Sequence, residues 1–160
     1  MSINRTPWVG FGLQIEPKWR ARIDLARMMA RQLSQRFGHI RLSLGLFFRV
    51  SVLVVNLNGE KFLVGIRENK HPGHTVRIWE IWVSPSRFPL ASDHFPEDEQ
   101  DRYAKDLMVI SNEIHAVLSR TPGVTRLRWW FAGWDRTRPG VPTPRELPWP
   151  KDSAAVGQDS

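Results

Sequence analysis

Residues 41–85 read RLSLGLFFRVSVLVVNLNGEKFLVGIRENKHPGHTVRIWEIWVSP and decide the fold of this 160-residue chain. Apolar runs are separated by two turn sequences, Asn58-Gly59 and His71-Pro72-Gly73-His74. Runs of this kind, bounded by turn residues, predict strands joined as hairpins. We therefore expect three antiparallel strands here, with the flanking segments packed over them.

The register of the first hairpin decides which side chains reach the core, because a slip of one residue exchanges the two faces. A two-residue Asn58-Gly59 turn would place Val54 opposite Leu63, and a loop one residue longer would place it opposite Phe62. We expect the longer loop, with Gly59 left-handed in a bulge. The expected core face then holds Phe48, Val50, Val52, Val54, Phe62, Val64, Ile66, Trp79, Ile81 and Val83. The opposite face is expected to hold Arg49, Ser51, Leu53, Val55, Lys61, Leu63, Gly65, Arg67, Ile78, Glu80 and Trp82.

One helix is expected before these strands and one after them. From Pro17 to Phe37, large apolar residues recur at helical spacing, and Gly38 suits a left-handed C-terminal cap. The second helix is expected to start after Pro96, in an acidic turn that complements the helix dipole. Its buried stripe is predicted to consist of Tyr103, Leu107, Ile110, Ile114 and Val117.

Residues 124–134 alternate apolar and basic side chains and predict a fourth strand. The expected fold is α+β: an antiparallel sheet of about four strands with two helices on one face, in the order α-β-β-β-α-β. Residues 17–134 form the expected single domain. Residues 1–16 are predicted to be an irregular or short extended arm that packs onto the body. Residues 135–160 are predicted to be a Pro-rich extended arm with a disordered tail.

The net charge of +7 is concentrated in the first predicted helix. Residues 17–41 contain seven basic side chains against the single acid Asp24. Such an imbalance indicates an anionic partner, either nucleic acid or an acidic protein surface, although a solvated helix face in an Arg-rich chain is the plain alternative. The candidate binding residues on this helix are Arg20, Arg22, Arg27, Arg31 and Arg36.

The fourth strand supplies three more candidates for the same partner, Arg126, Arg128 and Trp130. Aromatic rings interleaved with arginines on an exposed sheet can stack bases and hold phosphates. The alternative, which we favour, places the tryptophans in the core and the arginines on the wet side of an edge strand.

Glu80 is an acid between large apolar residues, so it needs a partner if it is buried. With Arg67 near it and His71 or His74 as an acid, it could serve a metal-independent ribonuclease. A structural ion pair between Glu80 and an arginine is the favoured interpretation. His115, beside the stripe of the second helix, is expected to be partly exposed.

No motif fixes a reaction, and no cofactor or metal is expected. The chain has no cysteine, and its longest apolar run, 42–57, is too short and too polar to span a bilayer. We expect a small cytoplasmic, non-catalytic binding protein that engages an anionic partner through the basic helix, with nucleic acid slightly favoured. The alternatives are a protein-interaction partner, such as a toxin-neutralising or chaperone-like protein, and the ribonuclease. The sequence leaves the oligomeric state open.

Overall fold

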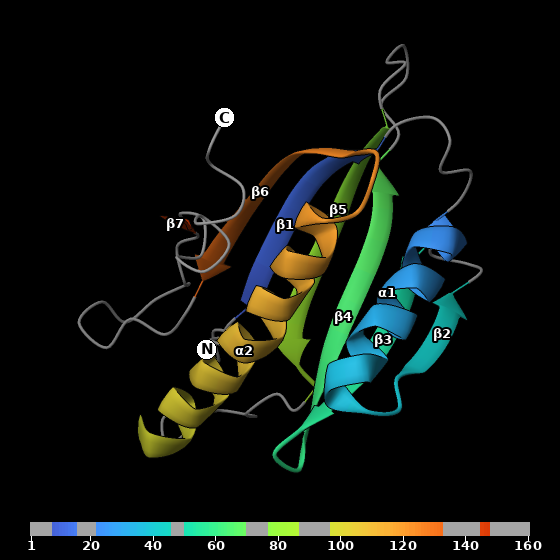
Figure 1. Ribbon diagram of the computed structural model, residues 1–160. Helices are drawn as coiled ribbons and strands as arrows, with labels where there is room; N and C mark the ends of the chain where they lie inside the picture. The colour runs from blue at the N-terminus through green and yellow to red at the C-terminus, as the bar shows by residue number, and fades with distance from the viewer. Residues whose placement is uncertain are drawn as a thin grey trace.

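A single antiparallel sheet with two helices across one face makes up the computed structural model (Figure 1). The structure describes residues 8–15, 22–45, 50–69, 77–86, 97–132 and 145–147. The described strands are β1 (Trp8–Ile15), β2 (Arg41–Gly45), β3 (Val50–Leu57), β4 (Glu60–Asn69), β5 (Arg77–Pro85), β6 (Val124–Ala132) and the two-residue β7 (Arg145–Glu146). The helices are α1 (Arg22–Phe37) and α2 (Glu97–Ser119). The α+β class with two helices is confirmed, but the sheet has more strands than the four expected.

The strand order is β2-β3-β4-β5-β1-β6-β7, which places the N-terminal strand inside the sheet. β1 pairs with β5 on one side and with β6 on the other. Trp8–Ile15 is therefore an internal strand rather than the arm that the sequence indicated. Its alternation explains the difference, because Val9, Phe11, Leu13 and Ile15 are buried while the glycines and Gln14 between them point the other way.

Both helices lie on the same face of the sheet, which we call the covered face. α1 packs on β2, β3 and β4, α2 packs on β1, β5 and β6, and the helices contact each other. The expected stripe of α2 is buried, as are Leu25, Met29 and Leu33 of α1. Gly38 has a φ of 79° and its amide bonds the carbonyl of Ser34, so the predicted left-handed cap is confirmed.

The expected register of the first hairpin is wrong. Val54 lies opposite Leu63 and Leu57 opposite Glu60, so the turn has only two residues. Asn58 and Gly59 have φ values of 52° and 79°, both left-handed, as a type I′ turn requires. The buried residues of β3 are consequently Ser51, Leu53 and Val55, while Val50, Val52 and Val54 face away from the helices. The expected faces of β4 and β5 are confirmed, since Phe62, Val64, Ile66, Trp79, Ile81 and Val83 are all buried.

A contact from α2 fixes the Asn58-Gly59 turn. The Asn58 side-chain amide donates a hydrogen bond to Asp106 Oδ1 at 3.0 Å, and Asp106 is only 4% exposed. One helical turn earlier, Arg102 approaches Glu60, the residue after the turn, at 3.6 Å. Both contacts join the hairpin to α2. The residues expected on the first strand before Val50, Phe48 and Arg49, lie outside the described residues, as does the second expected turn. The preceding Arg41–Gly45 forms a separate strand, β2, paired to β3.

The fourth predicted strand exists as β6, and it carries a bulge opposite Leu13. Arg126 in this bulge has a left-handed φ of 52°. At the edge of the sheet, β7 pairs with Trp130 and Phe131, and the Leu147 amide bonds the Trp129 carbonyl at 2.9 Å. Of the expected arm 135–160, this short pairing is the part that the structure describes.

Candidate functional site

The predicted basic face of α1 is only partly described. Arg27 and Arg31 are exposed and lie one helical turn apart, and neither forms an ion pair with any of the described side chains. Arg22 lies in the helix, but its side chain is outside the described set, and Arg20 precedes the described residues. Two like charges one turn apart repel each other by a few tenths of a kcal/mol, roughly 0.2–0.5. A bound anion would remove that repulsion.

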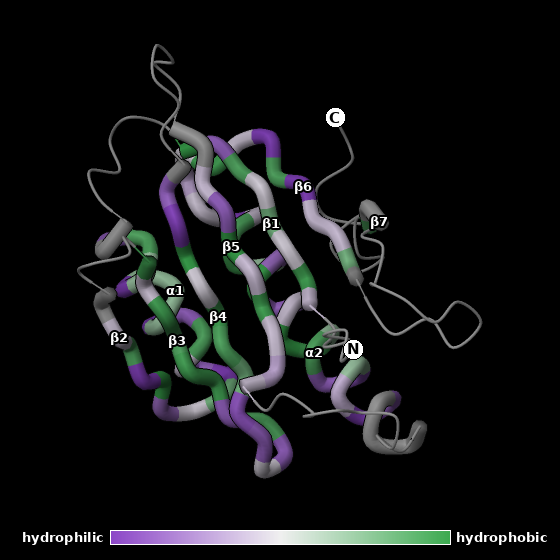
Figure 2. Tube along the Cα trace, turned by 180° about the vertical axis from the view of Figure 1, so that it is seen from behind, coloured by the Kyte–Doolittle hydropathy of each residue, from purple (hydrophilic) through white to green (hydrophobic). Residues whose placement is uncertain are grey.

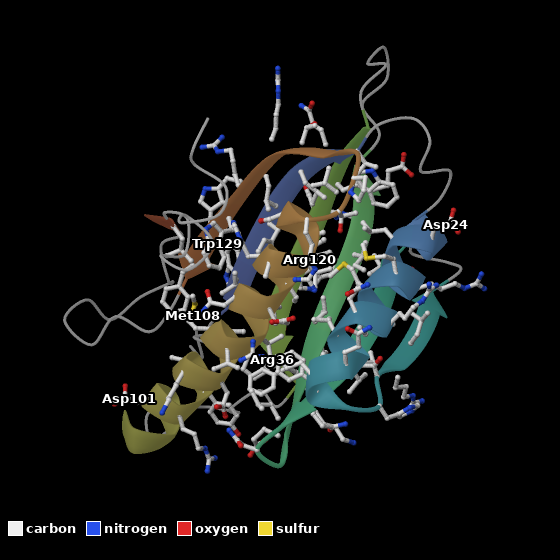
Figure 3. All side chains as sticks on the ribbon, in the orientation of Figure 1. Asp24, Arg36, Asp101, Met108, Arg120 and Trp129 are labelled. Atoms are coloured by element: carbon white, nitrogen blue, oxygen red, sulfur yellow. The ribbon has the colours of Figure 1, made fainter. Side chains whose placement is uncertain are left out.

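Arg36, at the end of α1, has a different environment. Its guanidinium lies 2.8 Å from the carboxylate of Glu113 on α2, and Arg120 approaches the other oxygen of the same carboxylate at 4.0 Å. Arg120 also donates to Gln32 of α1 at 3.4 Å. Figure 3 shows Arg36 and Arg120 along the seam between the helices, so these arginines help to join α1 to α2.

The first turns of α2 do not lie against the first turns of α1 (Figure 1). Figure 3 places Asp101, in the first turns of α2, at the opposite end of the molecule from Asp24, which begins the described side chains of α1. The only acidic partner of an α1 arginine among the described side chains is Glu113. Among the described side chains, therefore, none neutralises Arg27 or Arg31 through an ion pair.

The three candidates on β6 lie close together but in different environments. Arg126 and Arg128 are exposed, and Trp130 is half-buried. The Arg128 guanidinium lies over the Trp130 ring, 5.2 Å from its centre, which is the geometry of a cation–π contact. The neighbouring Trp129 is 4% exposed and packs against Phe11 at 5.6 Å. The strand therefore combines both interpretations, with one tryptophan in the core and the next on the opposite face.

That opposite face, which we call the open face, carries three half-buried tryptophans, Trp8, Trp82 and Trp130. Figure 2 views the sheet from this side, with both helices behind it. Across the strands, Trp82 lies opposite Gly65 on one side and Gly10 on the other. Gly10 in turn lies opposite Trp130. A row of the sheet thus alternates glycine with tryptophan.

The sequence interpretation missed Trp8, Gly10 and Gly12 as parts of this surface. It assigned them to an arm, although from Val9 to Ile15 apolar residues alternate with glycine or glutamine. Period-two alternation is the signal for a strand with one buried face. The glycines disguised it, because glycine within a segment usually indicates a turn or a loop.

Glu80 pairs with Arg67 directly across the strands on the open face. Their side chains are 38% and 50% exposed, so this is a solvent-accessible ion pair of the kind we favoured. Gly65, two residues before Arg67 on β4, lies opposite Trp82. The other weak catalytic candidates, His71 and His74, lie outside the described residues.

His115 is 1% exposed, so the expectation that it is partly exposed is wrong. Its ring lies 4.6 Å from the ring of Trp129, and Ser119 Oγ lies 3.2 Å from Nδ1. Burial disfavours the charged imidazolium and lowers the pKa of His115 from 6.5 to about 4. This histidine is a neutral part of the core at physiological pH.

Within the described side chains, no group of three or more His, Asp or Glu residues could hold a metal ion. Neither described helix combines the length and the apolar character needed to cross a membrane. No protein-family model matches this sequence, and neither a curated protein nor a solved structure matches the chain.

Proposed function

We propose that this protein binds an anionic partner, with nucleic acid favoured over an acidic protein surface, through the outer face of α1. The observation that carries the proposal is the exposure of Arg27 and Arg31 on one side of the helix, with no ion pair to a described side chain. Arg36 and Arg120, by contrast, share the carboxylate of Glu113. The first pair is available to a partner, whereas the second is engaged within the fold.

The overall charge supports nucleic acid as this partner. A net charge of +7 and a sequence pI of about 10.7 match the electrostatic footprint of proteins that bind phosphate backbones. Arginine suits this role because its planar guanidinium can donate two parallel hydrogen bonds to one phosphate. Each phosphate contact also releases condensed counterions, so the affinity should fall steeply as salt rises.

The test is a salt titration of binding to labelled duplex DNA and RNA, followed by fluorescence anisotropy. Replacing Arg27 and Arg31 by glutamine removes two phosphate contacts. We expect weaker binding at low salt and a slope of log K against log salt that is smaller by about 2.

The matched control replaces Arg102 and Lys105 by glutamine, which removes the same charge from exposed positions on α2. This variant should retain the slope of the unmodified protein. Equal weakening by the two double variants would mean that net charge alone, and not the α1 face, attracts the nucleic acid. Binding of an acidic polypeptide in place of DNA and RNA would assign the same face to a protein partner.

A further inference from the structure

The rings of the open face occupy space that only glycine leaves. A Cβ atom on Gly65 would stand 2.2 Å from two ring atoms of Trp82, which is closer than any real contact. A Cβ on Gly10 would stand 2.7 Å from the Trp8 ring, and one on Gly12 would stand 3.3 Å from two atoms of the Trp130 ring. Each ring therefore lies across the backbone of the sheet. One side of the ring is pressed on the strand, and the half-buried side chain keeps its remaining surface toward solvent.

Glycine within a strand costs about 0.5–1 kcal/mol relative to alanine and often marks a close approach of another group. Here Gly10, Gly12 and Gly65 all lie on the open face. Trp82 and Trp130 are two strands apart in one row, which at the usual strand spacing separates them by roughly 10 Å. The rings are thus far enough apart to take separate planar groups.

The charges at the open-face positions of the strands favour an anionic occupant. Four cationic side chains lie at open-face positions of β2, β4 and β6, and they are Arg41, Lys61, Arg67 and Arg128. The acid among the described side chains at such positions is Glu80, and it is paired with Arg67. The Arg128 guanidinium lies over the Trp130 ring, so a base that stacks on this ring must displace the guanidinium, which then becomes available to a phosphate.

From these observations we propose that the open face binds single-stranded nucleic acid, with unpaired bases stacked on Trp82, Trp130 and Trp8 and the phosphates held by the surrounding arginine and lysine side chains. Stacking suits bases of any identity because each has a flat π surface. This surface lies on the opposite side of the sheet from α1, so the inference goes beyond the proposed function and can stand or fall separately.

The experiment compares a single strand of about 12 nucleotides with the same strand without bases, which has the same number of phosphates, and with the strand in a duplex. RNA and DNA versions are both measured. The unmodified protein should bind the base-bearing strand about 10-fold or more tightly than the abasic strand, because stacking contributes on the order of a factor of 10 per base. Its tryptophan fluorescence should be quenched by the base-bearing strand and not by the abasic one.

Two sets of variants separate stacking from apolar docking. Replacing Trp82 by leucine keeps an apolar group but removes the ring, so the preference for bases should fall by about 10-fold, and replacement by phenylalanine should restore part of it. Replacing Val52 and Val54 by threonine keeps the shape and makes the same face more polar. The threonine variant should bind single strands as the unmodified protein does. Thermal unfolding by circular dichroism verifies that each variant is folded.

Other results would overturn the proposal. Equal affinity for base-bearing and abasic strands, or no binding of either, would show that bases do not stack here. A Trp82→Leu variant that is less stable but unchanged in binding would assign the rings to the stability of the sheet alone. If the threonine variant instead disrupts self-association seen by analytical ultracentrifugation, the face belongs to a second copy of the chain. The α1 proposal is separable, because Arg27→Gln/Arg31→Gln should weaken duplex binding and leave the preference for bases intact.

Discussion

The covered and open faces of the sheet use the same residue type in opposite ways. In β5, Trp79 is fully buried under the helices, while Trp82, three residues later, lies half-buried on the open face. In β6, the adjacent Trp129 and Trp130 divide in the same manner. Strand parity alone separates the members of each pair, because successive side chains point to opposite faces.

The partners of the rings differ more than the rings themselves. On the covered face, Trp129 meets side chains, stacking on Phe11 at 5.6 Å and lying 4.6 Å from the His115 ring. On the open face, Trp82 meets the backbone at Gly65. Trp129 is thus enclosed by side chains of the fold, whereas Trp82 keeps part of its ring exposed.

The largest expected difference is in stability. Trp79→Ala should lower the free energy of unfolding by about 3–5 kcal/mol, because it removes a fully buried ring and leaves a cavity. Trp82→Ala should cost only about 1 kcal/mol, since the lost contacts are on a half-exposed surface. Urea denaturation of the two variants gives the comparison directly. Similar losses from both would mean that the open face is part of the core.

Acid should lower the free energy of unfolding through His115, which packs against the covered face. Its pKa in the folded protein is about 4, below the unfolded value of 6.5, so the unfolded chain binds the proton more tightly. The stability due to neutral His115 is complete above pH 6.5 and is lost as the pH falls toward 4, by at most about 3 kcal/mol.

Unfolding by urea between pH 4 and pH 7 measures this loss. In His115→Gln the slope of stability against pH over this window should become shallower. The exposed His39 provides the control, and His39→Gln should leave the slope unchanged. An unchanged slope in His115→Gln would show that other groups cause the acid sensitivity.

The stability of the protein should be sensitive to substitution of Asn58, which lies in the turn that sets which residues of β3 face the helices. Asn58→Ala removes the hydrogen bond to the buried Asp106 carboxylate and places alanine at a left-handed φ, so we expect a loss of about 2 kcal/mol. Asn58→Gly loses the same hydrogen bond but suits the backbone, so it should cost about 1 kcal/mol less than alanine. Thermal unfolding distinguishes the two, and equal losses would indicate that the hydrogen bond accounts for the whole effect.

The smallest predicted change is a gain in stability at Ser51. Its hydroxyl is fully buried on the covered face, and no described group accepts or donates a hydrogen bond to it. Ser51→Ala should therefore raise the free energy of unfolding by about 1 kcal/mol. Ser43→Ala, at an exposed position on β2, should change it by less than about 0.5 kcal/mol. A loss at Ser51 would reveal a partner for its hydroxyl.

Part of the fold was predictable from the sequence. Helical spacing identified the buried stripe of α2, and Gly38 marked the end of α1. The core faces of β4 and β5 followed from alternation, because the other face carries the polar residues Lys61, Arg67 and Glu80, whereas the buried face of residues 62–66 and 79–83 is apolar throughout. The Glu80–Arg67 pair followed from two charged residues on adjacent strands.

The register of β3 was not predictable from alternation, because both of its faces are rich in apolar residues. The three valines Val50, Val52 and Val54 were expected to be buried, but the buried residues are Ser51, Leu53 and Val55. Asn-Gly is itself a strong signal for the two-residue turn, and that signal was the better guide. The row of tryptophans on the open face was not predictable either, because it depends on β1 lying between β5 and β6. The glycines of β1 obscured its strand pattern in the sequence.

The sequence by itself determined the class of fold, the two amphipathic helices and the concentration of charge in α1, because these depend on local spacing and composition. Only the tertiary structure decided which strand lies between β5 and β6, which face of β3 is buried, and which arginines remain available. The physical reason is that these features depend on contacts between distant residues. Asp106 holds Asn58 across 48 positions of sequence, and Glu113 holds Arg36 across 77.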